Sequence, residues 1–258
     1  MADSPAIPLA IFGTSAGVLS AVGLWAYSVF VPRCQFWAPV IRSLPQREAV
    51  TLTFENGPDE QVTPRLLDLL ATENLKATFF VIGARAKQHP AEIRQIHAAG
   101  HTLGNHSLDH APGGWKRDLK YWQAQLRETQ SIVADITGTP PLLFRPPWGH
   151  KTRPIAAAAA GLHLPIVTWS VAAPRTADAA AFAKYMVKRT TGHDILLLHD
   201  GPEPGRDSPG SNREAMLSAL PAIFGALRDK RLQVVPLVDA LLAASDERAA
   251  QKLARSRA

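Results

Sequence analysis

The sequence predicts an α/β fold in which parallel strands alternate with helices. Short runs rich in β-branched, aromatic and aliphatic residues recur along the chain, and stretches of helical character separate them. Proline and glycine fall near the expected ends of the helices. Strands that alternate with helices form parallel sheets, and a barrel is one natural closure of such a sheet.

The expected strands are short apolar runs, in order Val50–Phe54, Ala77–Ile82, Thr102–Gly104, Leu142–Phe144, Leu164–Thr168, Ile195–Leu198 and Leu232–Val235. The expected helices are Val62–Thr72, Ala91–Ala99, Trp115–Thr137, Arg153–Ala160, Ala177–Thr190 and Arg213–Arg228. Proline costs little in a first helical turn, and such positions hold Pro64, Pro90 and Pro154. Glycine commonly ends a helix, and the expected ends carry Gly100, Gly138, Gly161 and Gly192.

The composition excludes several classes of protein. Of the 258 residues, 46% are hydrophobic and 19% charged, which excludes a mainly disordered chain. The single cysteine, Cys34, excludes a disulfide framework within the chain and a multi-cysteine zinc site. The net charge of +6 comes without a basic stripe interleaved with aromatic residues, so no nucleic-acid partner is expected.

The N-terminal segment is predicted to be a membrane anchor. Ser4 to Pro32 contains no Asp, Glu, Lys or Arg, and its apolar run is long enough to cross a bilayer as a helix. Trp25 and Tyr27 lie towards one end, where aromatic rings favour the membrane interface. One alternative is a signal peptide, which typically begins with positively charged residues that this segment lacks. The other alternative is a buried core helix.

The expected domain organisation is an anchor at 1–32, a linker at 33–48, a catalytic-type domain at 49–245 and a basic tail at 246–258. This makes the chain a single-pass membrane protein. Arg33, Arg42 and Arg47 follow the apolar run, and the positive-inside rule then places the main domain on the cytoplasmic side.

Polar side chains gather just past the ends of the expected strands. Ligands bind at the carboxyl ends of parallel strands, and these ends carry Glu55, Asn56, His106, His110, Arg145, Trp169 and His199. A hydrophobic core gains nothing from the charged and imidazole side chains, and burying any of them without a hydrogen-bond partner costs free energy. The sequence therefore predicts a functional site at this edge.

His106 and His110 are four residues apart, so a turn of helix or a tight loop can direct both imidazoles to one metal ion. Asn56 could add a carbonyl oxygen, Glu55 could act as the base towards a bound water, and His199 as the acid. Taken alone, two histidines at this spacing are more often surface or capping residues. Their position after a strand, beside the other polar strand ends, favours the metal site.

The motifs TLTFENGP, GNHSLDH, FRPPWGH and ILLLHD, in this order, resemble those of the NodB-type polysaccharide deacetylases, carbohydrate esterase family 4. The phrases KATFFVIG and GHTLGNHS add to the resemblance, which spans Val50 to Val238. It implies a distorted (β/α) barrel of about seven strands. It also implies removal of acetyl or related acyl groups from sugars with a divalent metal ion, zinc being the first expectation. The family acts on chitin oligomers, peptidoglycan, exopolysaccharide and lipid-linked sugars.

The resemblance also implies roles for individual residues. His106 and His110 would bind the metal with Asn56, Glu55 would be the base, and Arg145 would orient that carboxylate. His199 would be the general acid. A backbone N–H near Trp148 would face the oxyanion. The residues expected to contact the substrate are Pro147, Trp148, Trp169 and Leu197.

Two motifs depart from the family pattern. Glu55-Asn56 replaces the usual Asp-Asp pair, so the expected metal site loses one negative charge. The fourth motif has no aspartate after Val171, so His199 could lack its usual carboxylate partner unless Asp178 or Asp200 replaces it. Two functions stay open: a deacetylase of a cell-envelope polysaccharide or lipid-linked glycan, and a catalytically impaired protein that binds a glycan or regulates a partner. An anchored chain would meet its acetylated glycan at the membrane. The polymer-acting members of the family often work outside the cytoplasm, which opposes the side that the arginines indicate, so the side of the membrane stays open.

Overall fold

The computed structural model describes residues 10–204 and 211–245, with side chains for residues 20–204 and 212–245. Its helices are α1 (Ala10–Phe30), α2 (Val62–Thr72), α3 (Gly83–Gln88), α4 (Pro90–Ala98), α5 (Leu119–Thr137), α6 (Arg153–Ala160), α7 (Ala179–Arg189) and α8 (Ser211–Asp229). Its strands are β1 (Val40–Ile41), β2 (Ala49–Glu55), β3 (Thr78–Val81), β4 (Thr102–Asn105), β5 (Ile166–Val167), β6 (Val171–Ala172), β7 (Asp194–His199) and β8 (Gln233–Val234). There are also two short 3₁₀ turns, Gly114–Lys116 and Pro147–Gly149, and residues 237–245 are helical.

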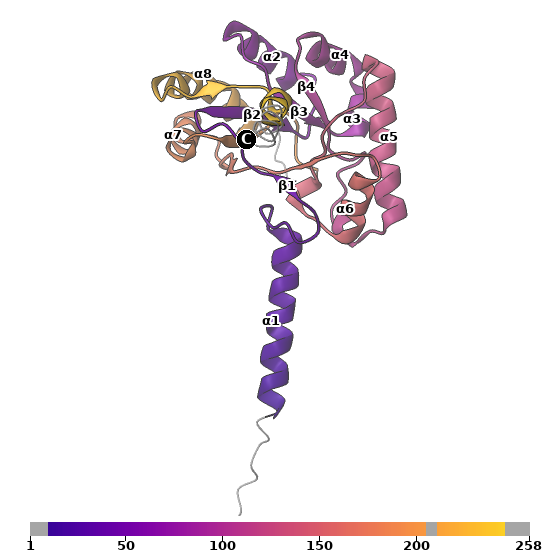
Figure 1. Cartoon of the computed structure of the whole chain (residues 1–258). Helices are drawn as coiled ribbons and strands as arrows, with labels where there is room; N and C mark the ends of the chain where they lie inside the picture. Colours follow the sequence, from indigo (N-terminus) through magenta and orange to yellow (C-terminus); the bar gives the residue numbers. More distant parts are fainter. Residues whose placement is uncertain (1–9, 205–210, 246–258) are drawn as a thin grey trace, which may run out of the picture.

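The strands pair in parallel, which confirms the predicted α/β class. One sheet has the order β4-β3-β2-β7-β6 with β8 added beside β2, and a second pairs β1 with β5. Phe144 links the two sheets because it bridges Asn105 at the end of β4 and Ile166 in β5. Figure 1 shows helices α2, α4, α5, α7 and α8 arranged around the strands, with α1 projecting from the domain as a stalk.

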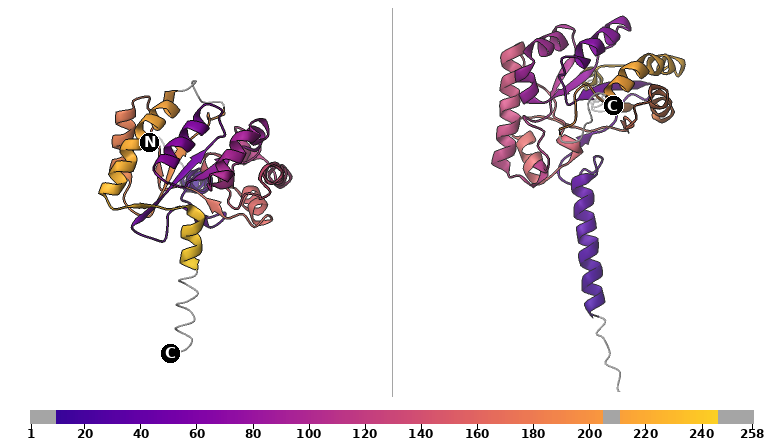
Figure 2. Two further views of the ribbon diagram at one scale, coloured as in Figure 1. Left: turned by 90° about the horizontal axis from the view of Figure 1, so that it is seen from above. Right: turned by 180° about the vertical axis from the view of Figure 1, so that it is seen from behind.

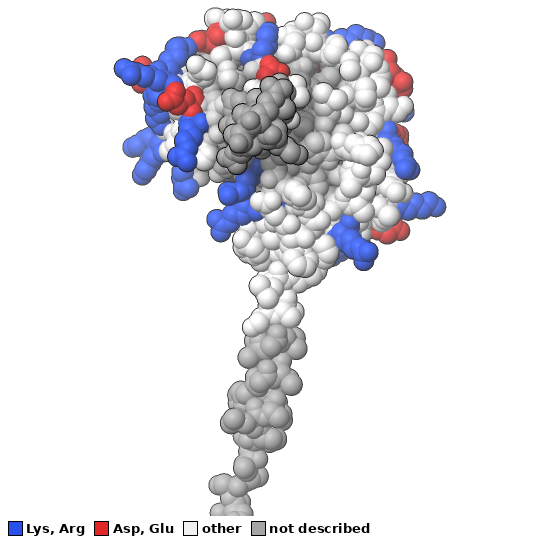
Figure 3. All heavy atoms as spheres, in the orientation of Figure 1, with Lys and Arg blue, Asp and Glu red and all other residues white. Residues whose placement is uncertain are grey.

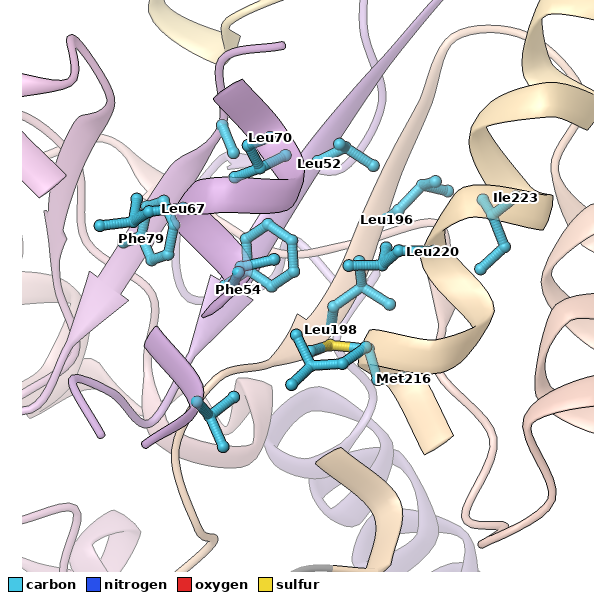
Figure 4. Packing of buried hydrophobic residues seen from close by; sticks show 14 of the residues in the cluster. Leu52, Phe54, Leu67, Leu70, Phe79, Leu196, Leu198, Met216, Leu220 and Ile223 are labelled. Atoms are coloured by element: carbon cyan, nitrogen blue, oxygen red, sulfur yellow. The ribbon is translucent and has the colours of Figure 1, made fainter. Parts of the chain in front are cut away.

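The main core lies between the central strands and two helices. Phe54 from β2, Phe79 from β3 and Leu198 from β7 are buried against Leu67 of α2 and Leu220 of α8 (Figure 4). A second cluster joins Trp122, Leu126, Phe144, Ile155 and Ile166 between α5, α6 and β5. Burial of aromatic and aliphatic side chains of this kind stabilises the fold by about 1.5–3 kcal/mol each.

Most element boundaries follow local signals in the sequence. α2 and α6 have the predicted bounds. α5 starts later than predicted, at Leu119, because the Asp118 side chain caps it by accepting a bond from Tyr121 N at 2.8 Å. The predicted strand Leu142–Phe144 is reduced to the bridging residue Phe144. The segment 33–48, expected as a linker, contributes β1 and the buried Leu44 to the fold.

The predicted anchor overlaps α1, a helix of 21 residues. The remaining residues of that anchor, 1–9, and the predicted basic tail, 246–258, lie outside the described residues. Within the part of the chain that the structure describes, no helix meets the length and apolarity needed to cross a membrane. The right-hand view of Figure 2 shows α1 from behind, again at one end of the domain.

Candidate active site

Neighbouring strands end side by side at one edge of the sheet and supply Glu55 and His199. β2 and β7 run in parallel with Glu55 directly opposite His199. Side chains alternate along a strand, and Phe54 and Leu198 belong to the core under the helices. Glu55 and His199 therefore point to the opposite face, away from that core.

The Glu55 carboxylate is the centre of the site. Its Oε1 lies 3.3 Å from His199 Nε2, and its Oε2 lies 3.4 Å from Arg145 Nη1 and 3.8 Å from His106 Nε2. Burial alone would raise the pKa of this carboxyl. The imidazole of His106, the hydrogen bond with His199 and the Arg145 guanidinium together outweigh burial and hold its pKa well below the usual range. Glu55 is therefore ionised at neutral pH.

Arg145 holds Glu55 in place from inside the protein. Its side chain is fully buried, and Nη1 also donates to Thr53 Oγ1 at 2.9 Å, while Nη2 donates to the Thr168 carbonyl at 3.0 Å. The guanidinium lies 4.1 Å from the centre of the Phe80 ring. Burial lowers the pKa of Arg145 to about 10, so it stays protonated at neutral pH. Fixed at both nitrogens, it can orient the carboxylate.

The loop after β4 carries the two histidines and is fixed by side-chain hydrogen bonds. Asn105 Oδ1 accepts from Ser107 N at 2.9 Å, and Ser107 Oγ accepts from His110 N at 3.1 Å. Ser107 and His110 both have positive φ, 66° and 50°, a conformation that costs non-glycine residues energy and is often found at functional sites. The result places the two imidazole centres 4.8 Å apart.

The histidines and Asn56 present polar atoms that no protein group satisfies. The Nδ1–H of His106 donates to the Arg145 carbonyl at 2.6 Å, which leaves Nε2 as the bare nitrogen. His106 Nε2, His110 Nδ1 and both side-chain atoms of Asn56 are buried without a hydrogen-bond partner. Burial lowers the pKa of His106, and burial is also the main cause that lowers the pKa of His110 to about 3. Both imidazoles are therefore neutral, the form that binds metals.

This donor set fits a divalent metal ion. Bare imidazole nitrogens and an amide oxygen are suitable ligands, and buried unpaired polar atoms are costly unless something binds them. Among the described residues, no three His, Cys, Asp or Glu side chains converge closely enough to hold a metal by themselves. Two imidazoles do not complete a metal site, and the buried, unpaired amide oxygen of Asn56 is a further donor of a suitable kind.

The structure identifies which carboxylate faces His199. The Asp178 side chain caps α7 by accepting from Ala180 N at 2.8 Å, so it is committed elsewhere. Asp200 accepts from Gly57 N at 3.2 Å and from Thr63 Oγ1 at 2.9 Å. The group that contacts His199 is Glu55. Its side chain is one methylene longer than that of aspartate, and its carboxylate faces both His199 and His106.

The Asp200 carboxyl has a raised pKa. It is 1% exposed, and burial raises its pKa to about 7 despite the bonds from Thr63 and Gly57. A β-carbon at position 57 would come within 2.0 Å of its carboxylate, so only glycine fits beside it. Asp200 is therefore a packed structural group under the turn that carries Asn56.

Replacing Asp200 with asparagine is expected to stabilise the metal-free protein at about pH 8 relative to about pH 5. The folded pKa of about 7 lies above the ordinary value of 3.8, so ionisation opposes folding. Stability is then lost as pH rises from about 4 to about 7, by up to about 4 kcal/mol. Urea unfolding of both proteins at the two pH values measures the difference. The same wild-type-to-variant difference at both values would contradict the assignment.

The residues expected to contact substrate surround this edge. The Trp148 ring lies 4.3 Å from that of His110, and its Nε1 donates to Glu203 Oε1 at 2.6 Å. Trp169 lies 5.7 Å from the Arg145 guanidinium. Leu197 is buried on the same face of β7 as His199, and Pro147 is buried in the turn before Trp148. Their contacts with substrate stay predictions.

Sequence reasoning did not identify several residues that support the site. Arg85 of α3 donates to the Asn56 carbonyl at 2.5 Å. Arg175, from the altered fourth motif, bonds to Glu203 at 2.9 Å and so ties that loop to Trp148. Neither Arg85 nor Glu203 follows a strand end directly, and only their folded positions reveal them.

Comparison with known proteins shows the family of the chain. The family model described as polysaccharide deacetylase matches residues 43–167. A peptidoglycan-N-acetylglucosamine deacetylase of Bacillus cereus is 31% identical over 196 residues, covering 74% of this chain and 87% of the relative. The chain belongs to the polysaccharide deacetylase family. This confirms the resemblance predicted from its motifs.

Two further similarities define its extent. The peptidoglycan-N-acetylglucosamine deacetylase PgdA of Listeria monocytogenes is 35% identical over 164 residues, 63% of this chain, but the match spans only 34% of that relative. The solved peptidoglycan N-acetylglucosamine deacetylase Bc1960, bound to 4-naphthalen-1-yl-N-oxidanyl-benzamide, has a TM-score of 0.70 and 28% identity. That match covers 78% of this chain and 92% of Bc1960.

Proposed function

We propose that this chain is a metal-dependent hydrolase that removes acetyl or related acyl groups from a sugar of a cell-envelope polysaccharide or lipid-linked glycan. The observation that carries the proposal is the contact of one buried carboxylate, Glu55, with His199, Arg145 and His106. Unpaired metal-type donors lie on the adjoining residues. The family membership supports the same chemistry.

His106, His110 and Asn56 would hold the ion, with zinc as the expected metal. A bound divalent ion would lower the pKa of a water and polarise the acyl carbonyl. Glu55 accepts the proton from the attacking water, and Arg145 keeps the carboxylate directed at it. The water oxygen bonds to the acyl carbon, the bond from that carbon to the sugar nitrogen or oxygen breaks, and His199 donates the proton to the leaving group.

Release of acetate from acetylated sugars tests the proposal. The full-length chain in detergent is incubated with N-acetylglucosamine oligomers and with peptidoglycan, with zinc supplied or with a chelator present. Acetate that forms with zinc and not with the chelator supports the proposal. If neither substrate yields acetate with zinc supplied, the alternative function is the better one: a protein that binds a glycan or regulates a partner. The altered Glu55-Asn56 pair favours that alternative.

Replacing Asn56 with aspartate is expected to tighten metal binding. The side chain is buried and unpaired, and the attraction between an added negative charge and a dication is about 8 kcal/mol at about 4 Å and an intermediate dielectric, before the cost of burying the charge is subtracted. Titration calorimetry with zinc should then show an affinity gain of about tenfold or more. Unchanged affinity in the variant would mean that residue 56 does not ligate the ion.

We also propose that α1 belongs to a single-pass membrane anchor. The proposal rests on the charge-free segment Ser4 to Pro32 and on the helical conformation from Ala10 to Phe30. After extraction of membranes with alkaline carbonate, the full-length chain should stay in the pellet. Its recovery in the soluble fraction would remove the anchor.

A further inference from the structure

The end of α1 packs against the loop that carries Trp148. The Phe30 ring lies 4.9 Å from that of His150 and 5.0 Å from that of Trp115. His150 in turn stacks near Trp148, with ring centres 5.8 Å apart. A continuous row of rings therefore leads from the stalk helix to the metal-binding histidines, because Trp148 contacts His110.

A buried lysine fastens the same two segments together. Lys151 is 0% exposed, and its Nζ donates to the carbonyls of Val31 at 3.2 Å, Pro32 at 2.9 Å and Gly149 at 3.0 Å. Its backbone N–H donates to the Val29 carbonyl at 3.0 Å. A β-carbon on Gly149 would lie 2.9 Å from both Pro32 and Trp169. The chain thus leaves α1 directly into the wall of the site, without an intervening linker.

We propose that the residues after α1 form one wall of the active site and hold its mouth at the membrane surface, so that the substrate is a lipid-linked acylated saccharide. This rests on the proposed function and on the anchor. Each residue of a flexible linker would let the site lie about 3.3–3.6 Å further from the bilayer. Here Pro32 packs against Gly149, so the residues that follow α1 do not form such a linker. A sugar attached to a lipid lies close to the bilayer surface, within reach of a site held there. The sugars of a cell-wall polymer can lie much further from the bilayer.

The surface around the end of α1 suits this substrate class. Trp25 and Tyr27 are each 45% exposed and Phe36 is 73% exposed, which is typical of a membrane interface. Lys116 and Arg117, both exposed, follow Trp115, against which α1 packs. Figure 3 shows neither Lys or Arg nor Asp or Glu on the described end of α1, where it joins the domain, and Lys and Arg side chains on the part of the domain above it. Cations here would attract the phosphate that joins such a lipid to its sugar.

Two matched substrates test the inference. The full-length chain is placed in lipid nanodiscs with zinc, and acetate release is compared for a soluble N-acetylglucosamine oligomer and for the same sugar on a polyprenyl diphosphate in the disc. The expected kcat/KM is higher for the lipid-linked sugar by about tenfold or more, since both partners share one surface. Equal values, or a preference for the soluble oligomer, overturn the inference and leave the proposed function intact. No acetate from either substrate overturns the proposed function itself.

Charge reversal separates a specific surface from a general effect of the membrane. Lys116→Glu with Arg117→Glu should lower kcat/KM for the lipid-linked sugar about tenfold and leave the neutral soluble oligomer within about twofold. The control is Lys188→Glu with Arg189→Glu on α7, an equal change of charge at two exposed residues. Equal loss in the two variants would contradict a substrate-binding role for this surface.

A depth measurement tests the orientation without any reaction. A nitroxide on Cys34 should lie at the headgroup level in power-saturation experiments, because Cys34 N bonds to the Val31 carbonyl at 3.0 Å. The control label is placed by Asp68→Cys, with Cys34→Ser, on α2 at the end of the domain opposite α1 (Figure 1). Equal accessibility of both labels to an aqueous relaxation agent would overturn the orientation.

Discussion

Replacing Glu55 with glutamine is expected to lower the rate of acetate release by about two to four orders of magnitude, the usual worth of general acid–base catalysis. Glutamine keeps the shape of the side chain but cannot accept a proton at neutral pH. Glu55 faces both His106 and His199, so it is the carboxylate in position to take the proton. Turnover is measured with N-acetylglucosamine oligomers at saturating zinc.

The variant Glu55→Asp is the matched control. It retains a carboxylate at the position where the family usually has aspartate, but it is one methylene shorter and loses reach towards His199. It should therefore retain far more activity than Glu55→Gln. Turnover of the glutamine variant within a few-fold of wild type would assign the base to another residue.

Several parts of this arrangement follow directly from local sequence. Helices α2 and α6 have bounds that match the pattern of apolar residues and the prolines in their first turns. Strands β2, β3 and β7 are rich in apolar and β-branched residues because both faces of a central parallel strand are buried. The polar residues at their ends could be grouped because the carboxyl ends of parallel strands meet at one edge.

Other parts depend on long-range pairing that no local pattern encodes. β1 and β6 have only two residues each and exist because β5 and β7 pair with them. The raised pKa of Asp200 follows from its burial in the folded protein, where it is 1% exposed, and no local pattern shows that burial. The contact between Glu55 and His199 joins residues 144 positions apart, and only the register of β2 and β7 brings them together.

That contact changes the interpretation of the two altered motifs. From the sequence, glutamate at position 55 and the missing fourth-motif aspartate are two separate losses. In the folded protein the Glu55 carboxylate lies 3.3 Å from His199 and keeps its bond to Arg145, so we propose that it also takes the place of the missing aspartate. The charge missing at Asn56 has no such replacement among the contacts of that side chain, since both its polar atoms are unpaired.

Removing both imidazoles with His106→Ala and His110→Ala is expected to abolish metal retention. Each ring offers a buried nitrogen without a protein partner. A structural zinc site with four ligands is worth about 10–16 kcal/mol, roughly 3 kcal/mol per ligand, so losing two ligands should weaken binding by about four orders of magnitude. Mass spectrometry for metals on the purified full-length protein, after dialysis, measures the bound ion directly and needs no substrate.

The control for this pair removes two histidines from the surface, His97→Ala with His163→Ala, since both side chains are exposed. That variant should retain metal at the wild-type ratio, and circular dichroism should show the same helical content in all three proteins. The metal site is assigned from the bare nitrogens of His106 and His110. If wild type and the variant that lacks these two histidines hold equal amounts of metal, the ion binds elsewhere in the protein. A fall in metal content in both double variants would instead indicate non-specific binding by surface imidazoles.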